Sequence, residues 1–185
     1  MYNLADLRLE TRIIVQKVAD IYIQHTKPWF IGLVVHGSAV KGGFVPGCSD
    51  IDFILYVEDK ALNQRQELPL SLTMAIHREL AEIDIAPFRY IQFRVATLSN
   101  NEFGNVIPGT YRLVAGRLLQ PELSNEQLLA LCKVGLTELE PDRIIASHRL
   151  LDHGEGRLQR IVRGLCTEVY PALFQILTIQ NGDGY

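Results

Sequence analysis

Two short apolar runs, separated by a glycine-rich segment, limit what this chain can fold into. Residues 29–35 read WFIGLVV and residues 51–57 read IDFILYV, with few polar positions and many aromatic and β-branched ones. Runs of this length and composition are typical of strands that are buried on both faces. Such strands need covering layers on each side, so the pattern predicts a sheet flanked by helices.

The neighbouring segments supply elements that could cover or extend this sheet. Apolar residues at helical spacing predict helices over residues 4–25 and 67–82. Residues 88–98 alternate between apolar and polar positions, which predicts a third strand. Residues 100–110 contain glycine and proline and are expected to be mostly loop, and residues 111–119 fit either a helix or a strand.

The last third of the chain has a different pattern. Residues 125–179 show helical spacing, with breaks expected near Pro141, Gly154–Gly156 and Pro171. We therefore predict an α/β (α+β) core over residues 1–120 and a small helical C-terminal region over residues 121–185.

Composition excludes several classes of function. A net charge of -3 and a pI of about 5.9 argue against general nucleic-acid binding, which needs a basic footprint. No apolar run approaches the roughly 20 residues that span a bilayer, and the N-terminus does not resemble a signal peptide. We therefore expect a cytoplasmic protein that does not bind membranes.

The candidate site lies between the two apolar runs. Gly37 and Ser38 follow the first strand, where a missing side chain lets a ligand approach and the next amides could hold phosphate oxygens. Asp50 and Asp52 alternate at the start of the second strand, so both carboxylates project to one face. Two such charges favour a divalent cation between them, and hard oxygen ligands favour Mg²⁺ or Mn²⁺ shared with substrate phosphates.

The same residues have a simpler interpretation. Gly37 and Ser38 could form an ordinary turn, and the Asp50–Asp52 pair could be a solvated strand entry. The combination of strand, Gly-Ser, gap, Asp-Ile-Asp and apolar strand is more specific than either motif alone, and it favours nucleotidyl transfer.

This run, GSAVKGGFVPGCSDIDFILYV, resembles the signature of the DNA polymerase β-like nucleotidyltransferase superfamily. Within the superfamily it is most similar to the aminoglycoside adenylyltransferases and the minimal nucleotidyltransferases. The resemblance implies a nucleotidyltransferase-type mixed sheet in which Gly37 and Ser38 bind nucleotide phosphates. It also implies that Asp50 and Asp52 are catalytic residues that hold the metal ions.

The pattern departs from the family at its third carboxylate, which is expected on the next strand. Gln92 stands at that position, and a neutral amide cannot deprotonate a hydroxyl group. Asp84 is the nearest substitute and is our candidate for the missing catalytic acid, with a loop or cap role as the alternative. Lys41 could contact a phosphate or be a solvated lysine, and Arg94 shares the strand face of Gln92.

Two functional hypotheses follow. The first is a metal-dependent enzyme that moves a nucleoside monophosphate, with AMP as the expected one, from an NTP such as ATP to a hydroxyl group of a small molecule or protein. The second is a catalytically degenerate domain that binds a nucleotide or a partner protein. A homo-oligomer or a protein partner is compatible with both.

Overall fold

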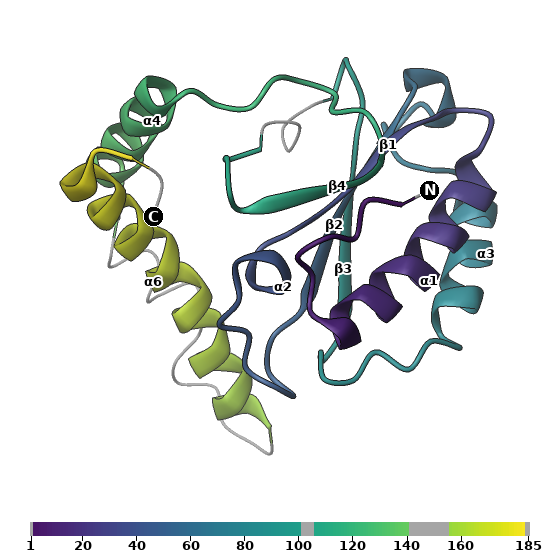
Figure 1. Ribbon diagram of the computed structural model, residues 1–185, viewed down its shortest axis with the longest axis horizontal. Coiled ribbons are helices and arrows are strands. Elements are labelled where there is room, and N and C mark those ends of the chain that lie inside the picture. Colours follow the sequence, from purple (N-terminus) through teal and green to yellow (C-terminus); the bar gives the residue numbers. More distant parts are fainter. Residues whose placement is uncertain (1, 101–105, 141–155, 184–185) are drawn as a thin grey trace. The chain divides into compact units, whose positions relative to one another are not determined.

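A four-stranded mixed sheet forms the centre of the first of two units in this computed structural model (Figure 1). The structure describes residues 2–100, 106–140 and 156–183. The first unit spans residues 1–122 and the second spans residues 123–185. Of the predicted helix breaks, Pro141 and Gly154 lie outside the described residues, whereas Gly156 directly precedes the helix Arg157–Asn181.

The first unit contains four strands and three α-helices within the described residues. In chain order the elements are α1 (Leu9–Thr26), β1 (Phe30–His36), α2 (Ser38–Lys41), β2 (Ile51–Val57), the 3-10 turn η1 (Asp59–Ala61), α3 (Leu70–Leu80), β3 (Ile91–Ala96) and β4 (Tyr111–Gly116).

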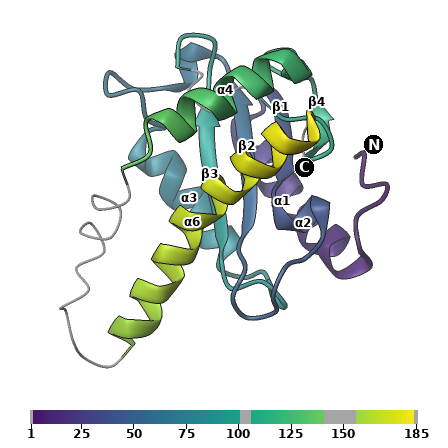
Figure 2. The same ribbon diagram turned by 90° about the vertical axis from the view of Figure 1, so that its left-hand side faces the viewer.

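The strands lie in the order β3-β2-β1-β4. β1 is antiparallel to both of its neighbours, whereas β2 and β3 are parallel, and Figure 2 shows β3, β2 and β1 side by side. The connection between β2 and β3 contains α3, as a parallel pair requires a crossover. This is the predicted mixed sheet with flanking helices, and the α+β fold class is confirmed.

One face of the sheet carries the main hydrophobic core. Helices α1 and α3 cover this face (Figure 1), and Tyr22 of α1 packs edge-on against Phe53 of β2 with ring centroids 5.9 Å apart. The buried residues of this core include Val15, Val18, Leu33, Val35, Ile51, Phe53, Leu55 and Ile76. Because side chains alternate along a strand, the even-numbered residues of β2 point to the opposite face.

The opposite face has a smaller apolar cluster that covers only one end of the strands. Its buried members are Val34, Ile54, Tyr56, Ala96, Val106 and Leu119. Asp52 follows the same alternation as Ile54 and Tyr56 but lies at the other end of β2, beyond this cluster. The polar end of this face is therefore where the candidate site is built.

The second unit contains two described helices, α4 (Asn125–Thr137) and α6 (Arg157–Asn181). α4 begins with a capping box, in which the Ser124 hydroxyl accepts from the Gln127 amide and the Gln127 side chain accepts from the Ser124 amide. None of the helices within the described ranges is both long and apolar enough to cross a bilayer.

The structure contradicts one sequence-based prediction and decides between two alternatives in another segment. The expected break at Pro171 is wrong, because α6 continues through this proline. One proline removes a single backbone hydrogen bond, which the rest of a long helix can tolerate. Residues 111–119, which fitted either a helix or a strand, contain the edge strand β4.

Candidate functional site

The end of β1 forms a tight turn beside the start of β2. Gly37 has a φ of 75°, and its amide donates to the carbonyl oxygen of Thr110 at 3.0 Å. A Cβ atom at Gly37 would lie 3.0 Å from Oδ2 of Asp52. Glycine is favoured here because of the positive φ, and its missing side chain leaves the Asp52 carboxylate accessible from the turn.

Helix α2 starts directly after this glycine. Ser38 is its first residue and Lys41 its last, and Lys41 is exposed whereas Ser38 is half-buried. Ser38 and Lys41, two of the three residues predicted to contact nucleotide phosphates, thus lie at opposite ends of a single helical turn. Gly37, the third, lies beside the Asp52 carboxylate.

A row of polar side chains crosses the sheet at the level of Asp52. The backbone register places Asp52 opposite Gln92 of β3 and opposite His36 of β1, and His36 in turn opposite Tyr111 of β4. Residues that are directly paired on neighbouring strands project to the same face. Gln92 and His36 therefore flank Asp52, although they are separated from it by many residues in the sequence.

The Asp52 carboxyl group is held in an unfavourable environment for its charge. Burial raises its pKa to about 6, and Asp50 adds to this rise, whereas Arg94 opposes it. Both aspartates are half-buried, and the effect of Asp50 shows that the two carboxylates are close enough to repel each other. A cation between them would relieve this repulsion.

His36 shares the same electrostatic surroundings. Burial and the charge of Arg94 lower its pKa, and Asp50 acts in the opposite direction. No catalytic or binding role was predicted for His36 from the sequence, and the pairing of β1 with β2 brings it opposite Asp52.

The polar face of β3 carries Gln92 and Arg94, as the alternation predicted. The Tyr90 hydroxyl donates to Oε1 of Gln92 at 3.5 Å, which biases the orientation of the amide. Arg94 is exposed, and its charge lowers the pKa of both Asp52 and His36. The contact from Tyr90 was not expected from the sequence, although the alternation of residues 88–94 had already placed Tyr90 and Gln92 on one face.

Asp84 lies in the loop before β3. It is exposed, and its Oδ1 accepts a hydrogen bond from the Ala86 amide at 3.0 Å. This is the geometry of a local turn stabilised by an aspartate side chain. A catalytic role for Asp84 stays a prediction.

The donor atoms present fit a divalent cation that is bound by two carboxylates and completed by substrate oxygens. Asp50 and Asp52 would supply hard oxygen ligands, and their mutual repulsion favours a cation. Across the described residues, no group of three or more His, Cys, Asp or Glu side chains could hold a metal ion. A third protein carboxylate, as the family pattern expects, is therefore not part of this arrangement among those residues.

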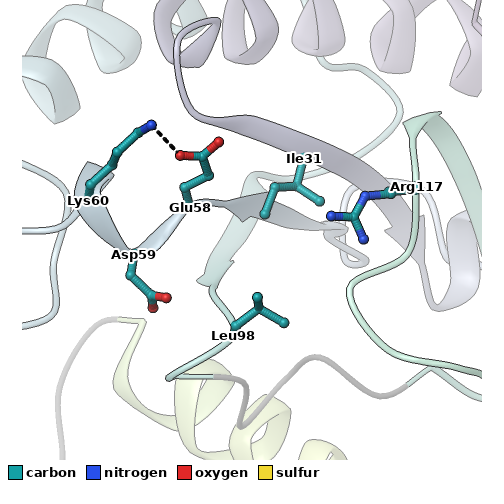
Figure 3. Close-up of a pocket in the computed structure, with 6 residues that line it drawn as sticks. All are labelled: Ile31, Glu58, Asp59, Lys60, Leu98 and Arg117. Atoms are coloured by element: carbon teal, nitrogen blue, oxygen red, sulfur yellow. Dashed lines mark ion pairs between the residues drawn. The ribbon is translucent and has the colours of Figure 1, made fainter.

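A separate groove of about 340 Å³ lies at the other end of the strands (Figure 3). It is lined by Ile31, Glu58, Asp59, Lys60, Leu98 and Arg117. Lys60 and Glu58 form an ion pair of 2.5 Å, and the Asp59 carboxylate accepts from the Ser99 amide and hydroxyl. None of the predicted site residues lines this groove, and two of its four charged side chains, Glu58 and Lys60, are paired with each other.

Comparisons with known proteins agree with the family suggested by the motif. The family model of the nucleotidyltransferase domain matches residues 16–103, which include both aspartates, the Gly-Ser turn and Gln92. Among curated proteins, no sequence gives a significant match.

One solved structure is similar in outline. It is a spectinomycin adenyltransferase from Enterococcus faecialis with ATP and spectinomycin, 16% identical, with 92% of this chain and 96% of that chain covered and a TM-score of 0.44. At this identity and TM-score the likeness carries no argument about what this chain binds.

Proposed function

We propose that this chain, whose residues 16–103 match the family model of the nucleotidyltransferase domain, transfers a nucleoside monophosphate, AMP in the first instance, from an NTP to an acceptor oxygen. The observation that carries the proposal is the Asp52 carboxylate beside the Gly37 turn, 3.0 Å from a Gly37 Cβ position, with Asp50 close enough to raise the pKa of Asp52. A side chain at this position would occupy the space between the turn and the carboxylate.

In this proposal the two aspartates hold Mg²⁺ or Mn²⁺. When bound, the ion neutralises phosphate charge and stabilises the departing pyrophosphate. The raised pKa of Asp52 supports this role, because a carboxylate in this position is stabilised by a cation at neutral pH.

Gly37, Ser38 and Lys41 are proposed to bind the triphosphate. The Gly37 turn presents backbone close to Asp52, and the Ser38 side chain follows directly. Lys41 is exposed at the end of the same helical turn and can contribute a point charge to a phosphate.

Calorimetric titration with ATP and Mg²⁺ tests the proposal. We expect binding to wild type, and loss of at least tenfold in affinity for the Asp50→Asn, Asp52→Asn double variant. A double variant at exposed positions of the same charge, Glu10→Gln with Glu82→Gln, controls for the change in net charge. Equal affinity for wild type and the aspartate variant, or no ATP binding to wild type, would contradict the proposal.

A second candidate is a domain that binds a nucleotide or a protein partner without catalysis. Gln92 favours it, because a neutral amide stands opposite Asp52 where the family pattern has an acid. Transfer of labelled AMP to any acceptor by wild type, abolished by Asp52→Asn, would eliminate this candidate.

The acceptor expected from the sequence is a hydroxyl group on a small molecule, such as an aminoglycoside, or on a protein. A cytoplasmic location and assembly with a further copy or a partner protein also stay predictions. The identity of the acceptor can be tested by incubating a panel of candidate acceptors with α-labelled ATP and analysing the products by mass spectrometry.

A further inference from the structure

The third strand offers no group that can remove a proton from an acceptor. Residues 85–98 contain no aspartate or glutamate, and the residue that pairs with Asp52 in the parallel register is Gln92. An alcohol has to lose its proton in order to become a strong nucleophile, and a general base on the neighbouring strand would take that proton. At the β3 position beside Asp52 this chain has an amide instead, and the His36 imidazole lies on the β1 side of Asp52.

An amide at this position suits a different kind of acceptor. A glutamine can donate two hydrogen bonds through its Nε2 atom but cannot take up a proton at neutral pH. The Tyr90 hydroxyl donates to Gln92 Oε1, an arrangement that leaves the Nε2 hydrogens to face other groups. Amide donors of this kind stabilise an oxygen that is already negative.

The next residue on the same face of β3 is cationic. Arg94 follows Gln92 by two positions and is exposed, and its charge is felt by both Asp52 and His36. A guanidinium group binds phosphate and carboxylate groups through two parallel hydrogen bonds. Gln92 and Arg94 therefore provide hydrogen-bond donors and positive charge on the β3 side of Asp52.

We propose that the acceptor of this enzyme is an acidic hydroxyl group that has already lost its proton, as in a phosphate monoester or a carboxylate, and that Gln92 and Arg94 bind it. This inference rests on the proposed nucleotidyl transfer and narrows its acceptor. The acceptor oxyanion forms a bond to the α-phosphorus of the NTP. The bond from the α-phosphorus to the bridging oxygen breaks, and its electron pair leaves with pyrophosphate. No proton is transferred in this step, so no base is required.

Three acceptors with one carbon skeleton test the proposal: glycerol, glycerol 3-phosphate and glycerate. Each is incubated with α-labelled ATP, Mg²⁺ and the full chain, and ³¹P NMR identifies whether AMP is attached to phosphate, carboxylate or alcohol oxygen. We expect transfer to the phosphate or the carboxylate at a rate at least 100-fold above transfer to an alcohol. The two anionic acceptors distinguish which acid the site prefers.

Variants of the two β3 residues separate binding from proton removal. Gln92→Glu places a carboxylate beside Asp52, and we expect it to lower transfer to the anionic acceptors at least tenfold and to raise transfer to glycerol. Arg94→Gln is expected to weaken binding of glycerol 3-phosphate at least tenfold, measured by calorimetry with Mg²⁺ and the non-transferable analogue α,β-methylene-ATP. Arg89→Gln is the matched control, since Arg89 is exposed and precedes β3 by two residues.

Several results would overturn the inference. The inference is wrong if the wild-type protein transfers AMP to glycerol as fast as to glycerol 3-phosphate. Loss of that transfer in His36→Gln or in Asp84→Asn would then identify the substituted residue as the general base. ATP binding without transfer to either anionic acceptor would also overturn it, in favour of the non-catalytic candidate. Absence of ATP binding would instead remove the proposed function itself, so the two failures are distinguishable.

Discussion

Replacing Asp52 by asparagine should stabilise the metal-free protein at neutral pH while it destroys the proposed site. Burial and Asp50 raise the pKa of Asp52 to about 6 in the folded protein, compared with about 4 in an unfolded chain. Between these values the folded state binds more protons than the unfolded state, so the free energy of unfolding falls as the pH rises. The penalty is absent below about pH 4 and complete above about pH 6.

The size of this penalty follows from the shift. Two pKa units correspond to about 3 kcal/mol, and because Asp52 is only half-buried, screening by water reduces this to about 1–2 kcal/mol. Asparagine has nearly the same shape and no charge. We therefore expect Asp52→Asn to raise the free energy of unfolding by about 1–2 kcal/mol at pH 8, and by nothing at pH 4.

Urea denaturation in EDTA at pH 4, 5, 6, 7 and 8 measures this difference. Glu82→Gln, at an exposed position, is the control for removing a carboxylate, with an expected change within about 0.5 kcal/mol. Added Mg²⁺ should stabilise wild type but not Asp52→Asn: at 10 mM, with a Kd on the order of 1 mM, the gain is about 1.4 kcal/mol. A variant less stable than wild type at pH 8, or a gain independent of pH, would refute the reasoning.

Three further substitutions test other parts of the structure. Gly37→Ala should lower the free energy of unfolding by about 1–2 kcal/mol because Gly37 has a positive φ, and it should weaken ATP binding because its Cβ would lie 3.0 Å from Asp52. Gly43→Ala is the control: Gly43 has a similar φ, but its Cβ would have nothing within 4 Å, so calorimetry should show normal ATP affinity. Phe53→Ala removes a fully buried ring of the main core and should lower the free energy of unfolding by about 3–5 kcal/mol in urea titrations, and a loss below 1 kcal/mol would contradict that packing. Ser124→Ala removes the capping box of α4 and should lower the free energy of unfolding by about 1 kcal/mol, which a lower thermal midpoint would show. Ser124→Asp should retain most of the stabilisation, because aspartate also caps helices.

Much of the fold could be predicted from local pattern. The strand over residues 51–57 has the predicted bounds, and the strands predicted over 29–35 and 88–98 contain β1 and β3 with small shifts at their ends. Helical spacing over residues 4–25 and 67–82 likewise identified α1 and α3. These predictions succeeded because the alternation of strands and the repeat of helices depend on neighbouring residues and on which face is buried.

Local pattern was insufficient where a distant contact decides the outcome. Residues 111–119 are weakly patterned, and β4 forms there because it pairs with β1, about 80 positions earlier in the chain. Pro171 was expected to end a helix, yet α6 continues on both sides of it. In each case the surrounding structure outweighs a preference that is small when taken alone.

For the candidate site, the sequence by itself predicted that Asp50 and Asp52 share one face of a strand and that a Gly-Ser turn precedes them. It placed Gln92 beside this pair only through the family pattern and did not indicate that His36 lies there too, because a shift of one residue in a strand pair would replace Gln92 by Ile91 or Phe93. The tertiary structure decided this through the register of β2 with β3 and β1, which places Gln92 and His36 beside Asp52. That register depends on the packing of a whole sheet face, which no local stretch of sequence contains.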